Sequence, residues 1–218
     1  MSSRRIAKLA GTSTMAVYTY FGSMSGLVRE MVHEGFGRLA AAFERSRPSG
    51  DPVADLALLG RVYRATAVEN AHLYSVMFGG RTLAGFELTE TDRQYGRFNL
   101  IRVVECTARC IASERFADED ATLVAHHMWL AMHGQVTLEI GGYLIEPCDA
   151  DRCFESQLVT LMVGAGDTAE AATASVLASA EVFAREFGAA SGRLDAPEET
   201  DGLDGRDGRR ERAPSESR

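Results

Sequence analysis

The stretch IAKLAGTSTMAVYTYFGSMSGLV, from Ile6 to Val28, decides how the chain begins. Its first residues place apolar side chains on one helical face, and Gly11 follows, where a helix often ends in a residue with positive φ. Ser13 is placed to cap a second helix over residues 14–21 by accepting a backbone N–H, and a third helix begins near Ser23. A short helix, a glycine-containing turn and a second short helix are typical of a DNA-reading helix held against its support.

The charge of this stretch differs from that of the whole chain. The 218 residues carry a net charge of −8, with the hydrophobic content of 45% that is usual for globular proteins. From residue 1 to residue 29 there is no acidic residue, and the basic residues are Arg4, Arg5, Lys8 and Arg29. A basic end on an acidic protein is expected of a phosphate-binding surface. A solvated helix end that is basic by chance is the alternative.

This stretch resembles the helix-turn-helix signature of tetracycline-repressor (TetR) family transcriptional regulators. The run AVYTYFGSMSGL, residues 16–27, is its most specific part, because a Tyr-x-x-Phe followed by a short turn and a new helix is unusual elsewhere. Two later segments are similar to the effector domains of one TetR subgroup: AHLYSVMF at 71–78, and Trp129 followed by His133-Gly134. Met24 departs from the family pattern, which has a phosphate-contacting lysine there.

The resemblance implies an all-α protein in three parts. We expect a helix-turn-helix domain with its connecting helix over residues 1–45, an antiparallel helical domain for ligand binding and dimerisation over 51–188, and a disordered tail over 189–218. Family members have one more helix before the point where this chain begins. We therefore expect the DNA-binding unit to be short at its N-terminus, the true start to lie upstream, and this chain alone to bind DNA poorly.

The resemblance also implies which residues meet DNA. The helix over residues 14–20 is expected to enter the major groove of a palindromic duplex, presented twice by a homodimer. Ser2 and Ser3 would hold the DNA backbone, and Arg4, Thr14 and Met15 would approach base edges. Met15 and Ala16 can offer only apolar contact, for instance to a thymine methyl group. The residues expected near phosphates are Tyr18, Thr19 and Tyr20.

Apolar periodicity predicts helices through the rest of the chain. One amphipathic helix covers residues 28–43, and a second begins with Asp51 as cap and Pro52 as first residue and runs to about 78. Glycines 79, 80 and 85 mark a loop. Further helices are expected over 89–112, 120–140, 154–165 and 169–187, the last with Asp167 and Glu170 in capping-box spacing. Residues 123–140 are apolar on most faces, which predicts burial on several sides.

Two sets of apolar residues suggest binding surfaces. One set would line a pocket for an unknown small-molecule effector, unless it simply packs the core: Tyr74, Phe78, Phe98, Trp129, Met132 and His133. The other set would form a two-fold four-helix dimer interface, unless it covers this chain's own core: Phe154, Leu158, Leu161, Met162 and Ala165.

Catalytic, metal and membrane functions find little support in the sequence. No nucleophile can be paired with a base, so an enzyme is not expected. Residues 164–169, GAGDTA, follow a helical pattern rather than the strand that a dinucleotide site requires. Cys106 and Cys110 lack the spacing of common zinc sites, and His126 and His133 lie seven residues apart with no nearby acidic residue except Glu139. A metal or redox sensor made by these cysteines with the histidines at 126, 127 or 133 is the alternative, but we expect buried core or pocket residues and no metal or cofactor. No apolar run could span a bilayer and no secretory leader is present, which favours the cytoplasm.

Two functions of different classes remain. The first is a ligand-responsive, DNA-binding transcriptional regulator, with repression as the expected mode of action. The second is a helical ligand-binding or interaction protein that has lost DNA binding through N-terminal truncation.

Overall fold

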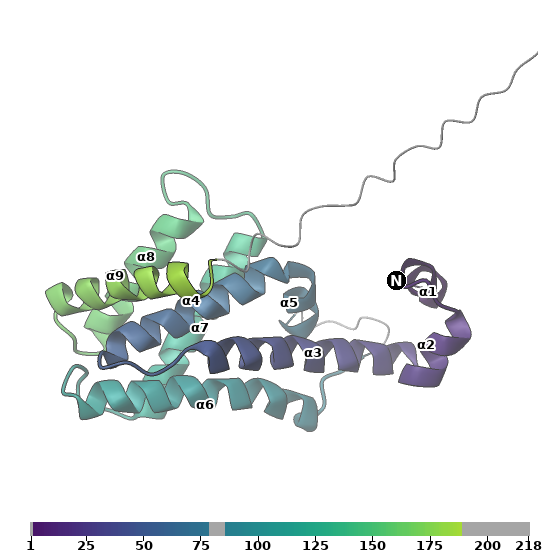
Figure 1. Cartoon of the computed structure of the whole chain (residues 1–218), viewed down its shortest axis with the longest axis horizontal. Helices are drawn as coiled ribbons and strands as arrows, with labels where there is room; N and C mark the ends of the chain where they lie inside the picture. Colours follow the sequence, from purple (N-terminus) through teal and green to yellow (C-terminus); the bar gives the residue numbers. More distant parts are fainter. Residues whose placement is uncertain (1, 79–85, 189–218) are drawn as a thin grey trace, which may run out of the picture.

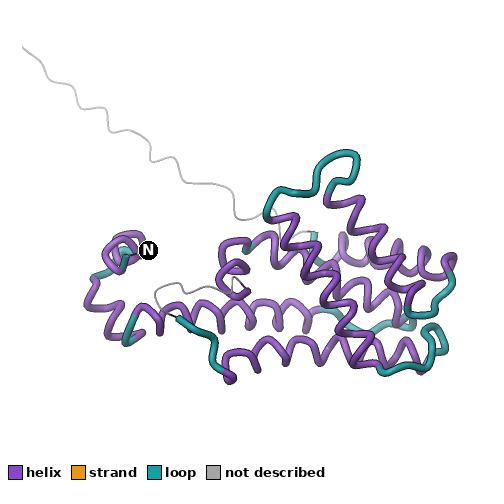
Figure 2. The backbone as a smooth tube through the Cα atoms, turned by 180° about the vertical axis from the view of Figure 1, so that it is seen from behind, coloured by secondary structure: helices purple, strands orange, loops and turns teal. Residues whose placement is uncertain are grey.

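The computed structural model describes residues 2–78 and 86–188, and every regular element in these two ranges is a helix (Figures 1 and 2). The predicted all-α fold is therefore confirmed. The expectations for glycines 79, 80 and 85 and for the tail over 189–218 lie outside the described residues. The helices are α1 Ser3–Leu9, α2 Thr14–Phe21, α3 Met24–Arg45, α4 Pro52–Glu69, α5 Ala71–Phe78, α6 Glu90–Ala112, α7 Ala121–Ile140, α8 Ala150–Gly164 and α9 Ala169–Glu186.

Helices α1 and α2 stand apart from the other helices, at the N-terminal end of the long helix α3 (Figure 1). Gly11 joins them with φ of +60°, and the Ser13 hydroxyl accepts a 3.0 Å hydrogen bond from the Ala16 amide. The Ser23 hydroxyl caps α3 in the same way, by accepting from the Gly26 amide at 2.9 Å. The turn and the α2 boundaries therefore agree with the sequence prediction, because each depends on one local side chain or glycine.

Helix α4 forms the centre of the remaining helices, with α3, α6, α7 and α9 packed against it. Its sequence is apolar around most of its circumference, so that Val53 and Ala57 are completely buried. Asp51 caps it with hydrogen bonds from the amides of residues 53 and 54, and Pro52 occupies its first turn, as predicted. None of the described helices is both long enough and apolar enough to cross a membrane.

The single helix predicted from 51 to about 78 is two helices. Asn70 ends α4 with φ of −117° and ψ of 40°, and its side chain donates a 2.8 Å hydrogen bond to the Thr66 carbonyl. The Asn70 carbonyl then accepts from the Tyr74 amide at 2.8 Å, which starts α5 in a new direction. Asparagine favours this break because its side chain competes for backbone hydrogen bonds.

Helix α7 agrees with expectation in part, and α9 differs from it at its cap. Helices α4, α6 and α8 pack against α7, but Leu123, Leu130 and Leu138 are exposed, so one of its apolar faces is open to solvent. Thr168, rather than Asp167, caps α9 by accepting from the Ala171 amide. Asp167 is buried and pairs with Arg115, at 3.0 and 2.6 Å from two guanidinium nitrogens. This long-range pair has no local signature, which is why the capping-box spacing misled the prediction.

The apolar stripe of α8 belongs to the core of this chain. Phe154, Leu158 and Met162 are almost completely buried against α4, α7 and their neighbours. The alternative left open by the sequence is therefore correct, and the prediction that this stripe contacts a second protomer is wrong. An amphipathic pattern shows that one face is covered but not by which chain.

Candidate functional site

Helix α2 buries one side chain and exposes most of the others. Val17 is the buried residue of α2, and Ala7 is the buried residue of α1. Met15 is 73% exposed and Tyr20 is 83% exposed. Among the predicted DNA contacts, those exposed are Ser2, Arg4, Met15, Tyr18, Thr19 and Tyr20, and those half-buried are Ser3, Thr14 and Ala16. The predicted set therefore lies on the accessible part of the N-terminal unit.

The inner faces of α1 and α2 are only partly packed. Ile6, Leu9, Val17 and Phe21 point by periodicity to one centre. In the structure Val17 is buried, Ile6 and Phe21 are half-buried, and Leu9 is 80% exposed. None of the described residues covers Leu9, so the unit presents this leucine to solvent beside its basic side chains.

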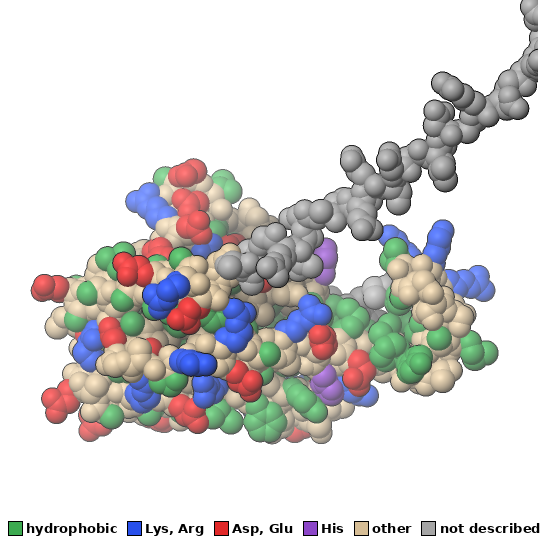
Figure 3. All heavy atoms as spheres, viewed as in Figure 1, with side chains coloured by type: hydrophobic (Ala, Val, Ile, Leu, Met, Phe, Trp, Pro, Cys, Tyr) green, Lys and Arg blue, Asp and Glu red, His purple; other side chains and the backbone are tan. Residues whose placement is uncertain are grey.

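The surface of the N-terminal unit is basic. Arg4, Arg5 and Lys8 all lie on α1 and are exposed. In Figure 3 the visible face of this unit carries blue side chains and no red ones, whereas the rest of the molecule mixes both colours. A basic surface favours binding to DNA, because neutralisation of the phosphates supplies most of the affinity of sequence-independent DNA binding.

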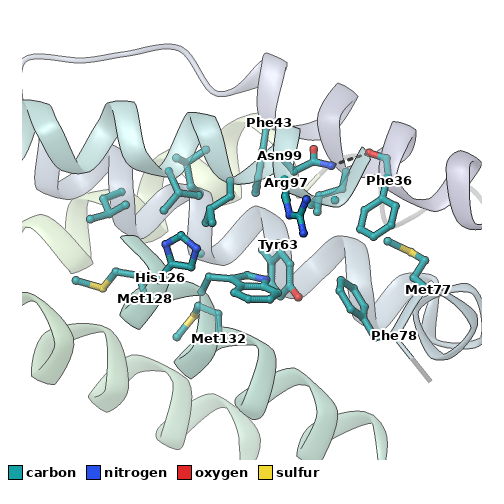
Figure 4. A pocket seen from close by; sticks show the side chains of 18 of the residues that line it. Phe36, Phe43, Tyr63, Met77, Phe78, Arg97, Asn99, His126, Met128 and Met132 are labelled. Carbon is teal, nitrogen blue, oxygen red and sulfur yellow. Dashed lines mark hydrogen bonds between the residues drawn. The ribbon is translucent and has the colours of Figure 1, made fainter. Parts of the chain in front are cut away.

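A cavity of about 340 Å³ lies among α3, α4, α6, α7 and α8 (Figure 4). Volumes of roughly 300–1,000 Å³ are typical of sites for small organic molecules. Most of the side chains in its wall are apolar or aromatic, and they come from all five helices and from the end of α5: Phe36, Leu39, Phe43, Leu56, Leu59, Tyr63, Phe78, Leu100, Val103, Met128, Trp129, Met132, Leu158, Leu161 and Met162. Such a wall favours an apolar ligand.

Half of the predicted pocket residues line this cavity: Phe78, Trp129 and Met132. Tyr74 lines a smaller adjoining cavity that shares Tyr63 and Phe78. His133 lies beside the aromatic wall, with its ring centroid 4.6 Å from that of Phe78 and 5.8 Å from that of Trp129. Phe98 is outside the wall, because it is 61% exposed on the opposite face of α6.

Sequence reasoning missed the contribution of α6 to the wall. Arg93, Arg97 and Leu100 line the cavity and are spaced by four and three residues along the helix. This spacing was the available signal that the three residues share one helical face. The aromatic residues of α6 formed a stronger apolar pattern on a different face, and that face is exposed.

A buried polar cluster connects α4, α5 and α7 next to the cavity. The Tyr63 and Tyr74 hydroxyls are 2.9 Å apart, and the Tyr74 hydroxyl lies 2.6 Å from Nδ1 of His133. Burial raises the pKa of both tyrosines and lowers the pKa of His133. The neutral imidazole can therefore accept a hydrogen bond from the Tyr74 hydroxyl, and the shared network holds three helices together.

A second polar cluster connects the cavity wall with α3. Asp92 lies in the first turn of α6, lines the cavity and is 1% exposed. Burial alone would raise the pKa of its carboxyl, but hydrogen bonds from the Thr89 hydroxyl and amide, and then from His33 and Arg29, lower it to about 2. Nε2 of His33 lies 2.8 Å from one Asp92 oxygen, and Nε of Arg29 lies 3.3 Å from the other.

The described cysteines and histidines form no metal centre. Cys106 and Cys110 are buried thiols on α6, and the Cys106 hydrogen bond together with burial raises the pKa of Cys110. Within residues 2–78 and 86–188 no three His, Cys, Asp or Glu side chains are grouped to hold an ion.

Comparison with known proteins supports the TetR family. Residues 56–161 match the family model described as tetracyclin repressor-like, C-terminal domain. No curated protein matches the chain in sequence. Family support therefore comes from this domain match, which runs from α4 to α8.

Three solved structures share the fold. A protein of unknown function from Rhodococcus sp. RHA1 is 25% identical, with 77% of this chain and 86% of that one covered and a TM-score of 0.65. The TetR family transcriptional regulator PfmR from Thermus thermophilus is 17% identical, with coverages of 75% and 88% and a TM-score of 0.61. A TetR/AcrR family regulator from Thermobifida fusca YX-ER1 is 20% identical, with coverages of 75% and 86% and a TM-score of 0.51.

Proposed function

We propose that this chain is a TetR-family transcriptional regulator that binds DNA in the cytoplasm as a homodimer and responds to a small apolar molecule, most simply as a repressor. The observation that carries the proposal is the pairing of two features in one fold. A basic helix-turn-helix unit with exposed Tyr18 and Tyr20 stands at one end of α3. An apolar cavity lies against the other part of the same helix, where Phe36, Leu39 and Phe43 form its wall.

Helix α2 is the DNA-reading helix in this proposal. It would enter the major groove with Thr14, Met15 and Ala16 toward the bases. Arg4 would reach a base edge, and the serines at 2 and 3 would hold the backbone. An arginine that reads guanine through two hydrogen bonds contributes roughly 1–3 kcal/mol of discrimination. The tyrosine hydroxyls near phosphates would add affinity without sequence preference.

The homodimer would form through the outer faces of α8 and α9. Val163 on α8 and Leu177 on α9 are exposed apolar residues on two helices that pack side by side. Small side chains flank Leu177 on the exposed side of α9, at positions 173, 174 and 178. Two copies of this helix pair related by a two-fold axis would give a four-helix interface.

The cavity would hold the effector. A ligand can change DNA affinity only if it binds the two conformations of the regulator with different affinities. The Asp92 cluster supports such coupling, because Asp92 belongs to the cavity wall while its partners His33 and Arg29 lie on the helix that carries the DNA-binding unit.

Selection from random duplex DNA tests the DNA-binding part. At protein concentrations high enough to reveal weak binding, we expect the wild-type protein to enrich a palindrome whose half-sites are centred roughly 34–36 Å apart, one turn of the duplex. Enrichment of no palindromic sequence at moderate salt would contradict the proposal.

Sedimentation tests the dimer. Leu177→Glu places a charge in the proposed interface and should give a monomer at micromolar concentration where the wild type is a dimer. Leu130→Glu, at an exposed leucine of α7, is the control and should leave the dimer intact. A stable wild-type monomer would refute the dimer, and an unaffected Leu177→Glu dimer would refute this interface.

A further inference from the structure

The wall of the cavity is uneven in charge. Most of it is apolar, but the α6 side also carries Arg93 and Arg97, one helical turn apart. In Figure 4 the Arg97 guanidinium points into the cavity, toward Tyr63. The Arg93 and Arg97 side chains are 53% and 54% exposed, so they lie where the cavity opens to solvent. A ligand that enters there with a negative charge can pair with their guanidinium groups.

The acidic groups nearby leave this pair of arginines with excess positive charge. Glu90 is the carboxylate that both share: it hydrogen-bonds Arg97, and its Oε2 lies 3.8 Å from Arg93. Asp92 also lines the cavity, but its oxygens are already occupied by Arg29, His33 and Thr89. Two guanidinium groups therefore face one available carboxylate, which leaves room for a second anion.

Two further polar groups line this side of the cavity: Asn99 of α6, whose amide nitrogen donates to the Phe36 and Tyr95 carbonyls, and a histidine of α7. His126 of α7 lines the cavity, and its Nδ1 lies 2.6 Å from the Thr122 carbonyl. Because a carbonyl oxygen can only accept, Nδ1 carries the proton and donates it there. The imidazole therefore adds no negative charge to the α6–α7 side of the cavity.

We propose that the cavity binds an elongated apolar monocarboxylate, with its carboxylate on Arg97 and Arg93 and its hydrocarbon body between α4, α6 and α7. This inference rests on the proposed effector role of the cavity and names the chemical class of the effector. Arginine suits the head group because its planar guanidinium can bind both carboxylate oxygens at once. The body would contact Leu59, Met128 and Trp129, which form the apolar wall.

Trp129 provides a direct probe, because it is the single tryptophan of the chain and lines the cavity. Decanoate, decanol and decylamine have the same chain length and differ in head group. Each is titrated into the full chain without DNA, below its aggregation concentration, and binding is followed by Trp129 fluorescence and by calorimetry. We expect decanoate to bind at least tenfold more tightly than decanol, and decylamine to bind most weakly.

Arg97→Gln removes the charge and keeps a polar side chain of similar reach. It should weaken decanoate binding at least tenfold and leave decanol binding within twofold. Arg102→Gln is the matched control on the same helix, since Arg102 lies outside this cavity and pairs with Glu105 at 3.9 Å. It should change neither affinity. Unchanged melting temperatures of both variants show that the fold is intact.

Several results would overturn the inference. These are decanol binding as tightly as decanoate, tighter binding of decylamine, no calorimetric binding of any of the three, or an Arg97→Gln variant that binds decanoate like the wild type. Because DNA is absent from the assay, failure here leaves the DNA-binding proposal intact. Arginine-dependent decanoate binding without any palindrome in the selection would instead overturn only the regulator proposal.

Discussion

His33 of α3 and Asp92 of α6 connect the helix that carries the DNA-binding unit with the wall of the cavity, through a 2.8 Å contact between Nε2 and Oδ1. The Asp92 carboxylate also accepts from the Thr89 hydroxyl and amide, so the same group caps α6. A ligand that displaces the first turn of α6 would therefore pull on α3 directly. Coupling of this kind requires an element with two arrangements that both sites influence.

Asp92→Asn tests the strength of this connection. The amide keeps the size of the side chain but removes the charge that pairs with His33 and Arg29. Because hydrogen bonds to charged groups contribute about 1.5–3 kcal/mol, we expect the free energy of unfolding in urea to fall by roughly 2 kcal/mol. Glu34→Gln, which breaks an exposed pair with Arg38 on the same helix, should cost less than about 0.5 kcal/mol. Equal losses in the two variants would contradict the role of Asp92.

The pH dependence of stability should carry a contribution from His133. Burial lowers the pKa of this imidazole below its ordinary value of 6.5. The unfolded chain therefore binds more protons than the folded one as the pH falls below 6.5, so stability decreases toward acid pH. The change is measured as the free energy of unfolding in urea between pH 7.5 and pH 5.5, roughly one unit on each side of 6.5.

A His133→Gln variant, which can still accept a hydrogen bond from Tyr74, should lose less stability over this interval than the wild type. His72→Gln, at an exposed histidine of α5, serves as the control and should behave like the wild type. A His133→Gln variant with the full wild-type slope would show that His133 is not the group responsible.

Arg115→Met should destabilise the fold strongly. Arg115 binds both oxygens of Asp167 and also donates to the Ser175 hydroxyl at 3.1 Å, which ties the α6–α7 connection to α9. Methionine leaves the Asp167 carboxylate buried without its cation, and breaking such a pair costs about 3–5 kcal/mol. Arg38→Met at an exposed ion pair should cost less than about 1 kcal/mol. Thermal and urea unfolding of the two variants should separate them clearly, and similar losses would argue against this assignment.

Two glycines of the N-terminal region should respond oppositely to alanine. Gly11 has φ of +60°, which alanine adopts only with strain of roughly 1 kcal/mol, although no atom lies within 4 Å of the added carbon. Gly37 lies within α3 and is equally open, so alanine there should stabilise the helix by about 0.5–1 kcal/mol. Hydrogen exchange of α2 and α3 amides measures both effects. Stabilisation by Gly11→Ala would contradict the observed turn.

Local features were the predictable part of this fold. The Gly11 turn, the Ser13 cap and the Asp51–Pro52 start of α4 depend on residues within a few positions of one another. The identity of the partner that covers a helical face was not predictable. On α6 the face with Phe98 reads as apolar yet is exposed, while the face with Gly96 and Arg97 turns toward the cavity.

The close approach of α3 to α6 explains part of this reversal. A Cβ atom at Gly96 would lie only 3.0 Å from Cζ of Phe36, so the absence of a side chain at position 96 lets α6 lie against that ring. Such a contact involves two residues 60 positions apart. The apolar pattern of neither helix reveals this contact. A glycine within a helix does not reveal it either, because it is compatible with many different neighbours.

The central claim is that the N-terminal unit reads DNA. The most direct test is to titrate the selected palindromic duplex with three variants and to follow binding by the anisotropy of the duplex. Tyr18→Ala should weaken binding to the palindrome and to a scrambled duplex alike, whereas Arg4→Ala should lower the preference for the palindrome about tenfold, as expected for roughly 1.4 kcal/mol of base discrimination. Arg152→Ala, at an exposed arginine of α8 far along the chain, should bind as the wild type does. Wild-type binding by both N-terminal variants, with loss of binding in Arg152→Ala, would contradict the account.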